Sequence, residues 1–359
     1  MLRRIRPSHG SRQELHSYRH APRGVDHDAR PPLPPSRPRG AHPSVVLTLA
    51  GRAQAASDAR LLAKYQPVTR FDPLESFSPT TVDTFVTDST LEQLDLVTGT
   101  WIVTDPDPSL TSLPGPGTGV WRLNQQPCAP NASLGGLACY ESSWKAHDAA
   151  SIVYGRVAHL QDRVVVQYWY FYYDNVYSYQ YPPSDFIWQS HEGDWEVVNV
   201  VLDAADDGPL YAGYSQHCLG QRRAWAKVPR WHGTHPVVRV AYGSHANYYS
   251  GGTHQIDPRC LPAQAITILQ ANGLPLPVDY ASAGKFYGPS AFGAKVTSIL
   301  AIAAGSPPWT AFPGFWGEAE YFKVPPYGAV GLGTFSPVGP VYHAVWQHPL
   351  ETLATWSSG

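Results

Sequence analysis

Three residues with the chemistry of metal ligands stand close together in the middle of the chain. His191, Asp194 and Glu196 form the pattern H-x-x-D-x-E. Successive side chains of a strand point to opposite faces, so Asp194 and Glu196 are expected to share one face. A turn at Gly193 would bring the imidazole of His191 back over both carboxylates. One nitrogen and two carboxylates suit a hard divalent ion, Ca²⁺ or Mg²⁺, better than Zn²⁺.

Two stretches typical of β-strands frame this pattern. Residues 168–174 are almost all aromatic, and residues 197–201 are rich in valine. Aromatic and β-branched residues favour strands. We therefore expect two strands joined by a Tyr/Pro/Ser loop, with the candidate ligands at the strand ends. Trp195, on the face opposite Asp194, is expected in the core.

The composition indicates a mainly β protein. Hydrophobic residues make up 43% of the 359 residues and charged residues only 15%, whereas Pro (35) and Gly (31) are plentiful. Such a chain can build a core and is rich in turns. The tail from 305 to 350 and the loops 104–119 and 127–137 are expected to be irregular. Strands are expected at 68–71, 151–159, 163–173, 194–203, 209–216 and 236–242, and helices at 57–65, 263–271 and 290–304.

Charge divides the chain unevenly. Residues 1–56 hold ten Arg and three acids, a balance of +7, so the remainder carries −9 in a chain of net charge −2. An acidic body argues against nucleic acid as a partner. The first 43 residues have too little apolar surface to offset the entropy of ordering, and we expect 1–56 to be a disordered Arg/Pro-rich leader before a single domain, 57–359.

A short apolar run, 44–51, ends that leader. Ala53-Gln54-Ala55 follows it and fits a small-residue cleavage site, so the leader reads as a degenerate signal peptide. No run approaches the ~20 apolar residues of a transmembrane helix. The expected location is secreted or extracytoplasmic, with cytoplasmic as the alternative.

Four cysteines are compatible with export. None stands in a C-x-x-C spacing. The natural pairing joins Cys128 to Cys139 and Cys218 to Cys260, although four cysteines allow three connectivities. Four buried free thiols in a cytosolic protein are the alternative.

Several landmarks resemble the vacuolar protein sorting-associated protein 62 family. They fall in the same order over nearly all of residues 57–350. The landmarks are Tyr65-Gln66-Pro67 with Phe71, Glu75 and Pro79; the segment 191–196; Gly243-Ser244-His245-Ala246; Phe312-Pro313-Gly314-Phe315-Trp316-Gly317; and Gly339-Pro340 with Trp346 and Pro349. The biochemical function of that family is poorly defined, so this resemblance implies no mechanism.

A second resemblance overlaps the opening pattern. Residues 169–174 and 190–196 are similar to the aromatic strand and the Gly-His-Arg-His-Asp-Trp-Glu segment of the necrosis-inducing toxin family. That family consists of secreted cytolysins with a β-sandwich, and it holds a divalent cation used in recognising sphingolipid head groups. The resemblance implies a β-sandwich with peripheral helices and long Pro/Gly-rich loops. It also implies a fourth metal ligand, Asp174, beside His191, Asp194 and Glu196.

This chain departs from the toxin pattern at three positions. Because of them, the resemblance implies metal binding more strongly than it implies toxicity. Ser190, Glu192 and Gly193 stand where the family has Gly, Arg and His. Residues 215–218, Ser-Gln-His-Cys, are similar to the family's Ser-x-His-Gly segment, with Cys218 in place of Gly.

Three classes of function follow, in this order. The first is a metal-assisted module that binds lipid head groups or glycans, with membrane activity as an extension of that role. The second is a metal-dependent hydrolase in which His217 or His245 carries protons. The third is a scaffold with a structural ion. No dinucleotide fingerprint, phosphate-binding Gly loop or G-x-S-x-G motif occurs, which leaves enzymatic activity the weaker reading.

Overall fold

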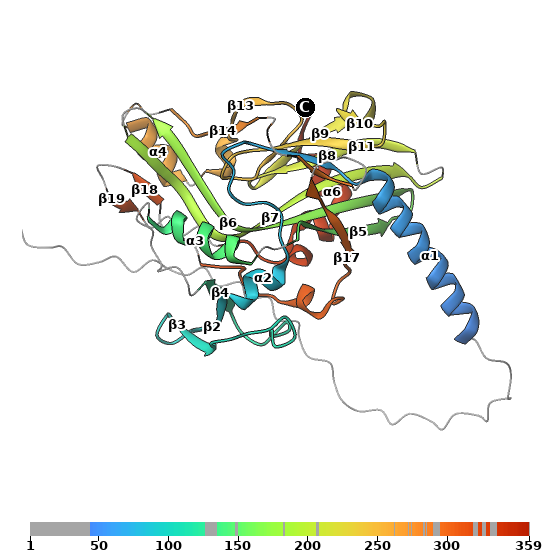
Figure 1. The fold of residues 1–359 in the computed structure, drawn as a ribbon, viewed down its shortest axis with the longest axis horizontal. Helices are drawn as coiled ribbons and strands as arrows, with labels where there is room; N and C mark the ends of the chain where they lie inside the picture. Colours follow the sequence, from blue (N-terminus) through green and yellow to red (C-terminus); the bar gives the residue numbers. More distant parts are fainter. Residues whose placement is uncertain are drawn as a thin grey trace, which may run out of the picture. The chain divides into compact units, whose positions relative to one another are not determined.

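The computed structural model is mainly β, with short helices at the periphery (Figure 1). It describes residues 44–125, 135–147, 150–181, 184–205, 208–261, 263–271, 273, 275–282, 284, 286–289, 295–318, 322–324, 328–330 and 336–358. The chain divides into two units, Met1–Thr48 and Leu49–Gly359, and every feature below except the first residues of helix α1 belongs to the second.

A seven-stranded sheet forms the middle layer of the second unit. The long hairpin of β6 (Arg163–Tyr181) and β7 (Ser184–Asp203) lies at its centre, and its strands pair in the order β17-β5-β6-β7-β8-β9-β20. The other strands are β17 (Ser298–Ala301), β5 (Ile152–His159), β8 (Pro209–Gln216), β9 (Leu219–Ala224) and β20 (Ser357–Ser358).

A second sheet covers one face of this layer. Its six strands are β10 (Arg230–Trp231), β11 (His235–Val240), β1 (Val68–Phe71), β15 (Phe286–Gly288), β16 (Lys295–Val296) and β12 (Asn247–Tyr248). Between the two sheets lies a core of Tyr168, Tyr170 and Tyr172 from β6 packed against Phe71 and Val240. Two sheets that enclose one core make the sandwich that the sequence indicated.

The opposite face of the seven-stranded sheet is covered by short elements and loops. The odd-numbered residues Trp169, Phe171 and Tyr173 of β6 pack there with Trp195 and Trp316. Because both faces of β6 are buried, its sequence is a continuous aromatic run instead of an alternating one. The covering elements are α2 (Val82–Thr87), α3 (Gly135–Ala146), α5 (Ala344–Gln347), α6 (Pro349–Thr355) and the sheet of β2 (Ser89–Asp95), β3 (Thr100–Asp105) and β4 (Trp121–Gln125).

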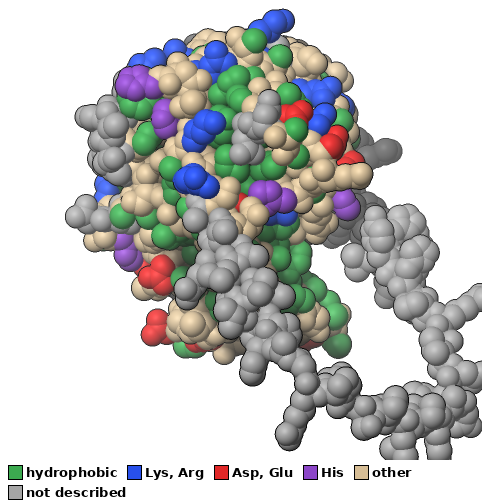
Figure 2. Space-filling model, turned by 90° about the vertical axis from the view of Figure 1, so that its right-hand side faces the viewer, with side chains coloured by type: hydrophobic (Ala, Val, Ile, Leu, Met, Phe, Trp, Pro, Cys, Tyr) green, Lys and Arg blue, Asp and Glu red, His purple; other side chains and the backbone are tan. Residues whose placement is uncertain are grey.

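The remaining elements complete the fold. They are α1 (Ser44–Tyr65), α4 (Ala263–Ala271), the pair β13 (Gly252–Gln255) and β14 (Val278–Ala281), the pair β18 (Phe322–Val324) and β19 (Gly328–Val330), and the 3₁₀ turns η1 (Trp225–Lys227), η2 (Pro258–Cys260), η4 (Pro308–Ala311) and η5 (Pro340–Tyr342). The predicted helix 263–271 is confirmed. On the face drawn in Figure 2, Lys, Arg and His side chains gather in the upper part, with hydrophobic side chains between them.

Three expectations were wrong. The helix expected at 290–304 is replaced by β16 and β17, because the apolar residues of 296–301 include β-branched Val296 and Ile299 and pair in parallel with neighbouring strands. Helix α1 begins at Ser44 instead of near residue 57, since the intervening residues are rich in the helix formers Ala, Leu and Gln.

The third concerns the hairpin. Instead of ending at Asp174 and resuming near Asp194, the β6–β7 ladder continues to the pair Tyr181 and Ser184. The alternation of tyrosines with polar residues in 176–181 is typical of a strand, and the Pro/Ser turn shrinks accordingly. His191 therefore lies inside β7 instead of before it.

Candidate functional site

Two carboxylates of β7 point into the space between the sheets. Asp194 and Glu196 pair across the β6–β7 ladder with Tyr172 and Tyr170, and paired residues of an antiparallel ladder lie on the same face. Trp195 lies on the other face, in the aromatic core. The shared face that the sequence predicted for the two acids is confirmed, and so is the core position of Trp195.

A tight turn after β11 places His245 against these acids. Its backbone has φ of 54°, and its ring stacks on Tyr172 with centroids 3.8 Å apart. His245 Nδ1 lies 3.1 Å from Asp194 Oδ2, and Nε2 lies 3.5 Å from Glu75 Oε1. Burial alone would lower the pKa of His245, but the charges of Glu75 and Asp194 outweigh it and raise that pKa to about 9. An imidazolium thus sits between two buried carboxylates at neutral pH.

Glu75 is fixed from both sides. Its carboxylate accepts hydrogen bonds from the backbone N–H groups of Phe77 (2.9 Å) and Gly243 (2.7 Å). Burial would raise the pKa of Glu75, and the charge of His245 together with these hydrogen bonds lowers it below its usual value. The residue therefore ties the turn 72–77 to the turn that carries His245.

Glu196 is hydrogen-bonded by two neutral side chains. Ser215 of β8 contacts its Oε2 by a hydrogen bond, and Asn247 Nδ2 donates to the same oxygen at 3.2 Å. Burial, and next the charge of Asp194, raise the pKa of Glu196 well above its usual value. The raised pKa favours the protonated form of Glu196, which is held between the sheets by these hydrogen bonds.

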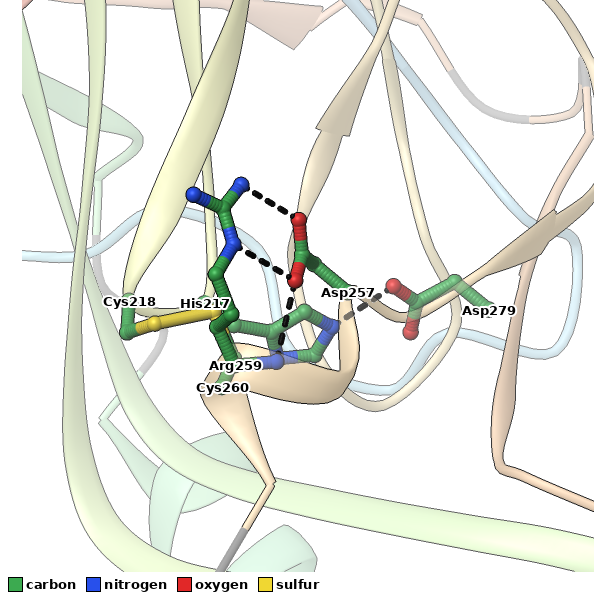
Figure 3. Close-up of a disulfide and its surroundings, with 6 residues drawn as sticks. All are labelled: His217, Cys218, Asp257, Arg259, Cys260 and Asp279. Atoms are coloured by element: carbon green, nitrogen blue, oxygen red, sulfur yellow. Dashed lines mark hydrogen bonds and ion pairs between the residues drawn. A yellow bond between two sulfur atoms is a disulfide. The ribbon is translucent and has the colours of Figure 1, made fainter. Parts of the chain in front are cut away.

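A second histidine and carboxylate pair stands beside the first group. His217, in the turn between β8 and β9, places Nε2 2.7 Å from Asp279 Oδ2 of β14, and Figure 3 shows its ring directed at that carboxylate. Asp279 is completely buried and also accepts from Ser244 Oγ (2.6 Å) and Tyr248 OH (2.5 Å). Burial would lower the pKa of His217, but the charge and hydrogen bond of Asp279 raise it overall.

The turn 243–247 connects the two groups. Ser244 bonds Asp279, His245 bonds Asp194, and Asn247 bonds Glu196. Its backbone is positioned by Gly243, whose φ of 76° lies in the left-handed region that favours glycine. We call Glu75, Asp194, Glu196, Ser215, His217, Ser244, His245, Asn247, Tyr248 and Asp279 the buried network.

His217 connects this network to solvent. Its side chain is 20% exposed, and it lines a cleft of about 260 Å³ beside the disulfide Cys218–Cys260. Around the cleft stand Gln216, Gln221, Tyr248, Gln255, Asp257, Arg259 and Ser357. Figure 3 shows the disulfide and the Arg259–Asp257 ion pair next to His217. The pairing of Cys218 with Cys260 was predicted correctly, whereas Cys128 lies outside the described residues.

The structure separates the four predicted metal ligands. Asp174 pairs with Glu192, and His191 pairs with Asn175, beyond Asp194 along the β6–β7 ladder. His191 Nδ1 lies 2.7 Å from the carbonyl oxygen of Gly193. Among the described side chains, no group of three or more His, Cys, Asp or Glu is placed so that it could hold a metal ion. Asp194 is instead bonded to His245, and the divalent cation stays a prediction from the sequence.

Glu192 has a structural role. Its buried carboxylate accepts from Gln125 N (3.0 Å), Tyr140 OH (3.0 Å) and Glu318 N (2.9 Å). Burial raises the pKa of Glu192 to about 8. The residue thus ties β7 to β4, α3 and the segment around Glu318.

The sequence alone indicated no chemical role for four members of the buried network. Ser244, Asn247 and Tyr248 surround a histidine that had been noticed, and Asp279 stands in an ordinary strand. Glu75 had appeared as a landmark of the first family resemblance but without a chemical role. An acidic residue between apolar neighbours, as in Val278-Asp279-Tyr280, is the signal that would have found Asp279.

Comparison with known proteins gives a distant likeness of fold. No protein-family model and no curated protein matches the chain. Necrosis and Ethylene inducing Protein 2 from the causal agent of cocoa's Witches Broom disease aligns at TM-score 0.29 and 13% identity, over 53% of this chain and 67% of that one. NLPPya in complex with glucosamine aligns at TM-score 0.30 and 14% identity, over 54% and 67%. The non-toxic HaNLP3 protein aligns at TM-score 0.25 and 15% identity, over 50% and 61%.

All three alignments are distant, and they assign nothing to the site. The resemblance to the vacuolar protein sorting-associated protein 62 family stays a prediction.

Proposed function

We propose that the chain is a secreted carbohydrate-binding module whose ligand enters the cleft at His217. The observation that carries the proposal is the lining of this cleft, in which amide, hydroxyl, imidazole and aromatic side chains converge on about 260 Å³. A sugar needs many donors and acceptors at close range together with some apolar contact, and Leu219, Ile256 and Pro258 in the cleft lining offer such contact. The volume lies just below the ~300–1,000 Å³ of pockets for drug-sized ligands, which suits one or two sugar units.

Charge at the cleft favours a neutral glycan. The imidazolium of His217 is balanced by Asp279, and Arg259 is balanced by Asp257 at 2.7 Å. Each charged group thus already has a counterion, and a neutral ligand displaces none of them. The glucosamine bound in NLPPya agrees with a sugar ligand for this type of fold, but it belongs to that protein.

One finding supports export. Disulfides such as Cys218–Cys260 persist in oxidising compartments and are rare in the cytosol. No helix in the described part of the chain has the length and apolar character of a membrane span.

Of the two histidines considered for hydrolysis, one reaches solvent. His245 is fully buried and held between Glu75 and Asp194, whereas His217 lines the cleft. A protonated His217 is a donor that can orient a sugar hydroxyl, which agrees with binding better than with general-base chemistry.

A glycan array followed by calorimetry tests the proposal. We expect the wild type to bind a neutral glycan, with the affinity lost in His217→Ala and lowered in Gln255→Ala, whose exposed side chain lines the cleft without contributing to the fold. His159→Ala, an exposed histidine outside the cleft, serves as the matched control. Binding that survives both cleft substitutions, or an array without any ligand, would refute the proposal.

A further inference from the structure

A second cavity lies at the other side of the seven-stranded sheet from the His217 cleft, beside the edge strand β17. Its volume is about 910 Å³, near the upper end of the ~300–1,000 Å³ typical of ligand pockets. One wall is helix α1, and the other is made by β5, β17 and the segment 301–306. The lining is mostly aliphatic: Ala55, Ala59, Leu62, Ala63, Val157, Pro289, Ile299, Ala301, Ile302, Ala303 and Ala304.

Arg156 provides a fixed positive charge in this apolar trough. Its guanidinium lies 4.0 Å from the ring centroid of Trp346, and its Nη1 donates to Gln167 Oε1 and to the carbonyl oxygen of Trp346, both at 2.8 Å. Gln167 is fixed in turn by Asn199 and by the carbonyl oxygen of Val345. The guanidinium is thus held in one orientation by partners that are all neutral.

No counterion accompanies this charge. Within the described part of the chain, no carboxylate lies within 4.0 Å of Arg156, and its Nε and Nη2 donate no hydrogen bond. Asp58, the acidic residue of the cavity wall, is already paired with His159 at 2.8 Å. Burial lowers the pKa of Arg156 to about 10, so the group is still charged at neutral pH.

The half-buried guanidinium of Arg156 keeps two donor groups available for a ligand. Guanidinium groups prefer planar, bidentate recognition of carboxylate or phosphate, and Nε with Nη2 present the paired donors for it. The adjoining walls offer aliphatic contacts and few hydrogen bonds, which suit a hydrocarbon chain. The site therefore combines one anion-binding end with one apolar end.

We propose that this trough binds a single-chain amphiphile with an anionic head, with the carboxylate or phosphate on Arg156 and the acyl chain along α1 and β17. The site is separate from the His217 cleft, and the proposal does not depend on carbohydrate binding. A free fatty acid and a lysophospholipid share the required chemistry.

The test uses the delipidated full chain and four probes with the same sixteen-carbon chain, each below its micelle concentration. Palmitate and palmitoyl lysophosphatidate carry the two anionic heads, whereas hexadecanol and monopalmitoyl glycerol are uncharged. Isothermal calorimetry gives the affinities, and native mass spectrometry gives the stoichiometry. We expect one anionic amphiphile to bind per chain, at least about tenfold more tightly than the uncharged probes, because a hydrogen bond to a charged group contributes ~1.5–3 kcal/mol. The preference between palmitate and lysophosphatidate identifies the source.

Three variants distinguish binding of the ligand's anionic head from binding of its acyl chain. Arg156→Gln should remove the preference for anions and leave weak binding of the chain, whereas Arg163→Gln, at a partly exposed arginine paired with Asp162, should change nothing. Ala59→Trp, at an exposed position of α1 that lines the trough, should block all four probes without disturbing the bonds of Arg156. It keeps the test decisive if Arg156→Gln fails to fold.

Three results would overturn the proposal: no saturable binding by either anion, equal affinity for charged and uncharged probes, or binding to folded Ala59→Trp that matches the wild type.

Discussion

The ion pair of His217 with Asp279 can be tested by measuring how the stability of a variant without the negative charge depends on pH. Asp279 is completely buried, and Asp279→Asn keeps its shape and its acceptor oxygen while removing the negative charge. His217 would then be left as a cation facing a neutral amide. Removing one partner of a buried ion pair costs ~3–5 kcal/mol, and the 20% exposure of His217 places the expected loss near the lower end, about 3 kcal/mol. With an unfolding entropy of ~2.1 cal/mol/K per residue over about 300 residues, that corresponds to a fall of roughly 5 °C in Tm.

The pH dependence of this loss has a defined sign. The pKa of His217 is raised in the folded protein, so its stabilisation is complete below the unfolded value of 6.5 and is lost as pH rises through the folded pKa. The pKa of Asp279 is lowered, so its stabilisation is complete above the unfolded value of 3.8 and is lost as pH falls through the folded pKa. The ion pair is therefore fully effective near pH ~5.5, between the two unfolded values.

Thermal unfolding of wild type and variant at two pH values checks this reasoning. We expect the Tm deficit of Asp279→Asn to be greatest near pH ~5.5 and smaller near pH ~10, because the stabilisation by His217 is lost as pH rises through its folded pKa. Asp257→Asn is the control, because this exposed residue also pairs with a cation and Asn preserves its capping contact with the N–H of Arg259. An equal deficit at both pH values would show that lost packing, and not charge, accounts for the effect.

Three further predictions concern the fold and its ions. Addition of EDTA should leave the Tm unchanged, because the imidazolium of His245 already balances the charge of Asp194. A fall in Tm that Ca²⁺ or Mg²⁺ reverses would instead establish the cation predicted from the sequence. Gly193→Ala should lower the free energy of unfolding by ~2 kcal/mol or more in urea titrations, because φ is +59° and the new Cβ would lie 2.1 Å from the carbonyl oxygen of Trp316. Gly305→Ala is the control. It has φ of +70° and open space around it, so it should cost only the backbone strain of ~1–2 kcal/mol. Replacing Cys218 and Cys260 together by Ser should lower the free energy of unfolding by up to about 4 kcal/mol, as expected for a loop closed over 42 residues, and an unchanged urea midpoint would contradict this.

The sequence was most informative where local pattern and tertiary environment agree. The aromatic run 168–173 predicted a strand, and the structure buries that strand on both faces. Helix 263–271 was equally readable because Asn272-Gly273 marks its end. By contrast, residues 296–301 have apolar positions compatible with either helix or strand, and pairing with β5, more than a hundred residues away, decides between them.

The partners of the site could not be predicted for a related reason. Glu75 meets Gly243 across 168 residues, and His217 meets Asp279 across 62. Nothing local distinguishes these acids from surface acids, since the desolvation that makes them unusual arises only when the two sheets close. The H-x-x-D-x-E pattern correctly located a concentration of buried acid, but it could not indicate which cation would balance that charge.

The structure shows which groups balance the charge of the buried acids. Two protonated histidines, each on a residue with φ of 54°, reach the acids from turns that no short motif connects to β7. A buried carboxylate is tolerated only when it is paired, protonated or bound to a metal, and here Asp279 and Asp194 follow the first course while the raised pKa of Glu196 indicates the second. The sequence therefore indicates metal ligands, whereas the fold places a histidine against Asp194 and another against Asp279.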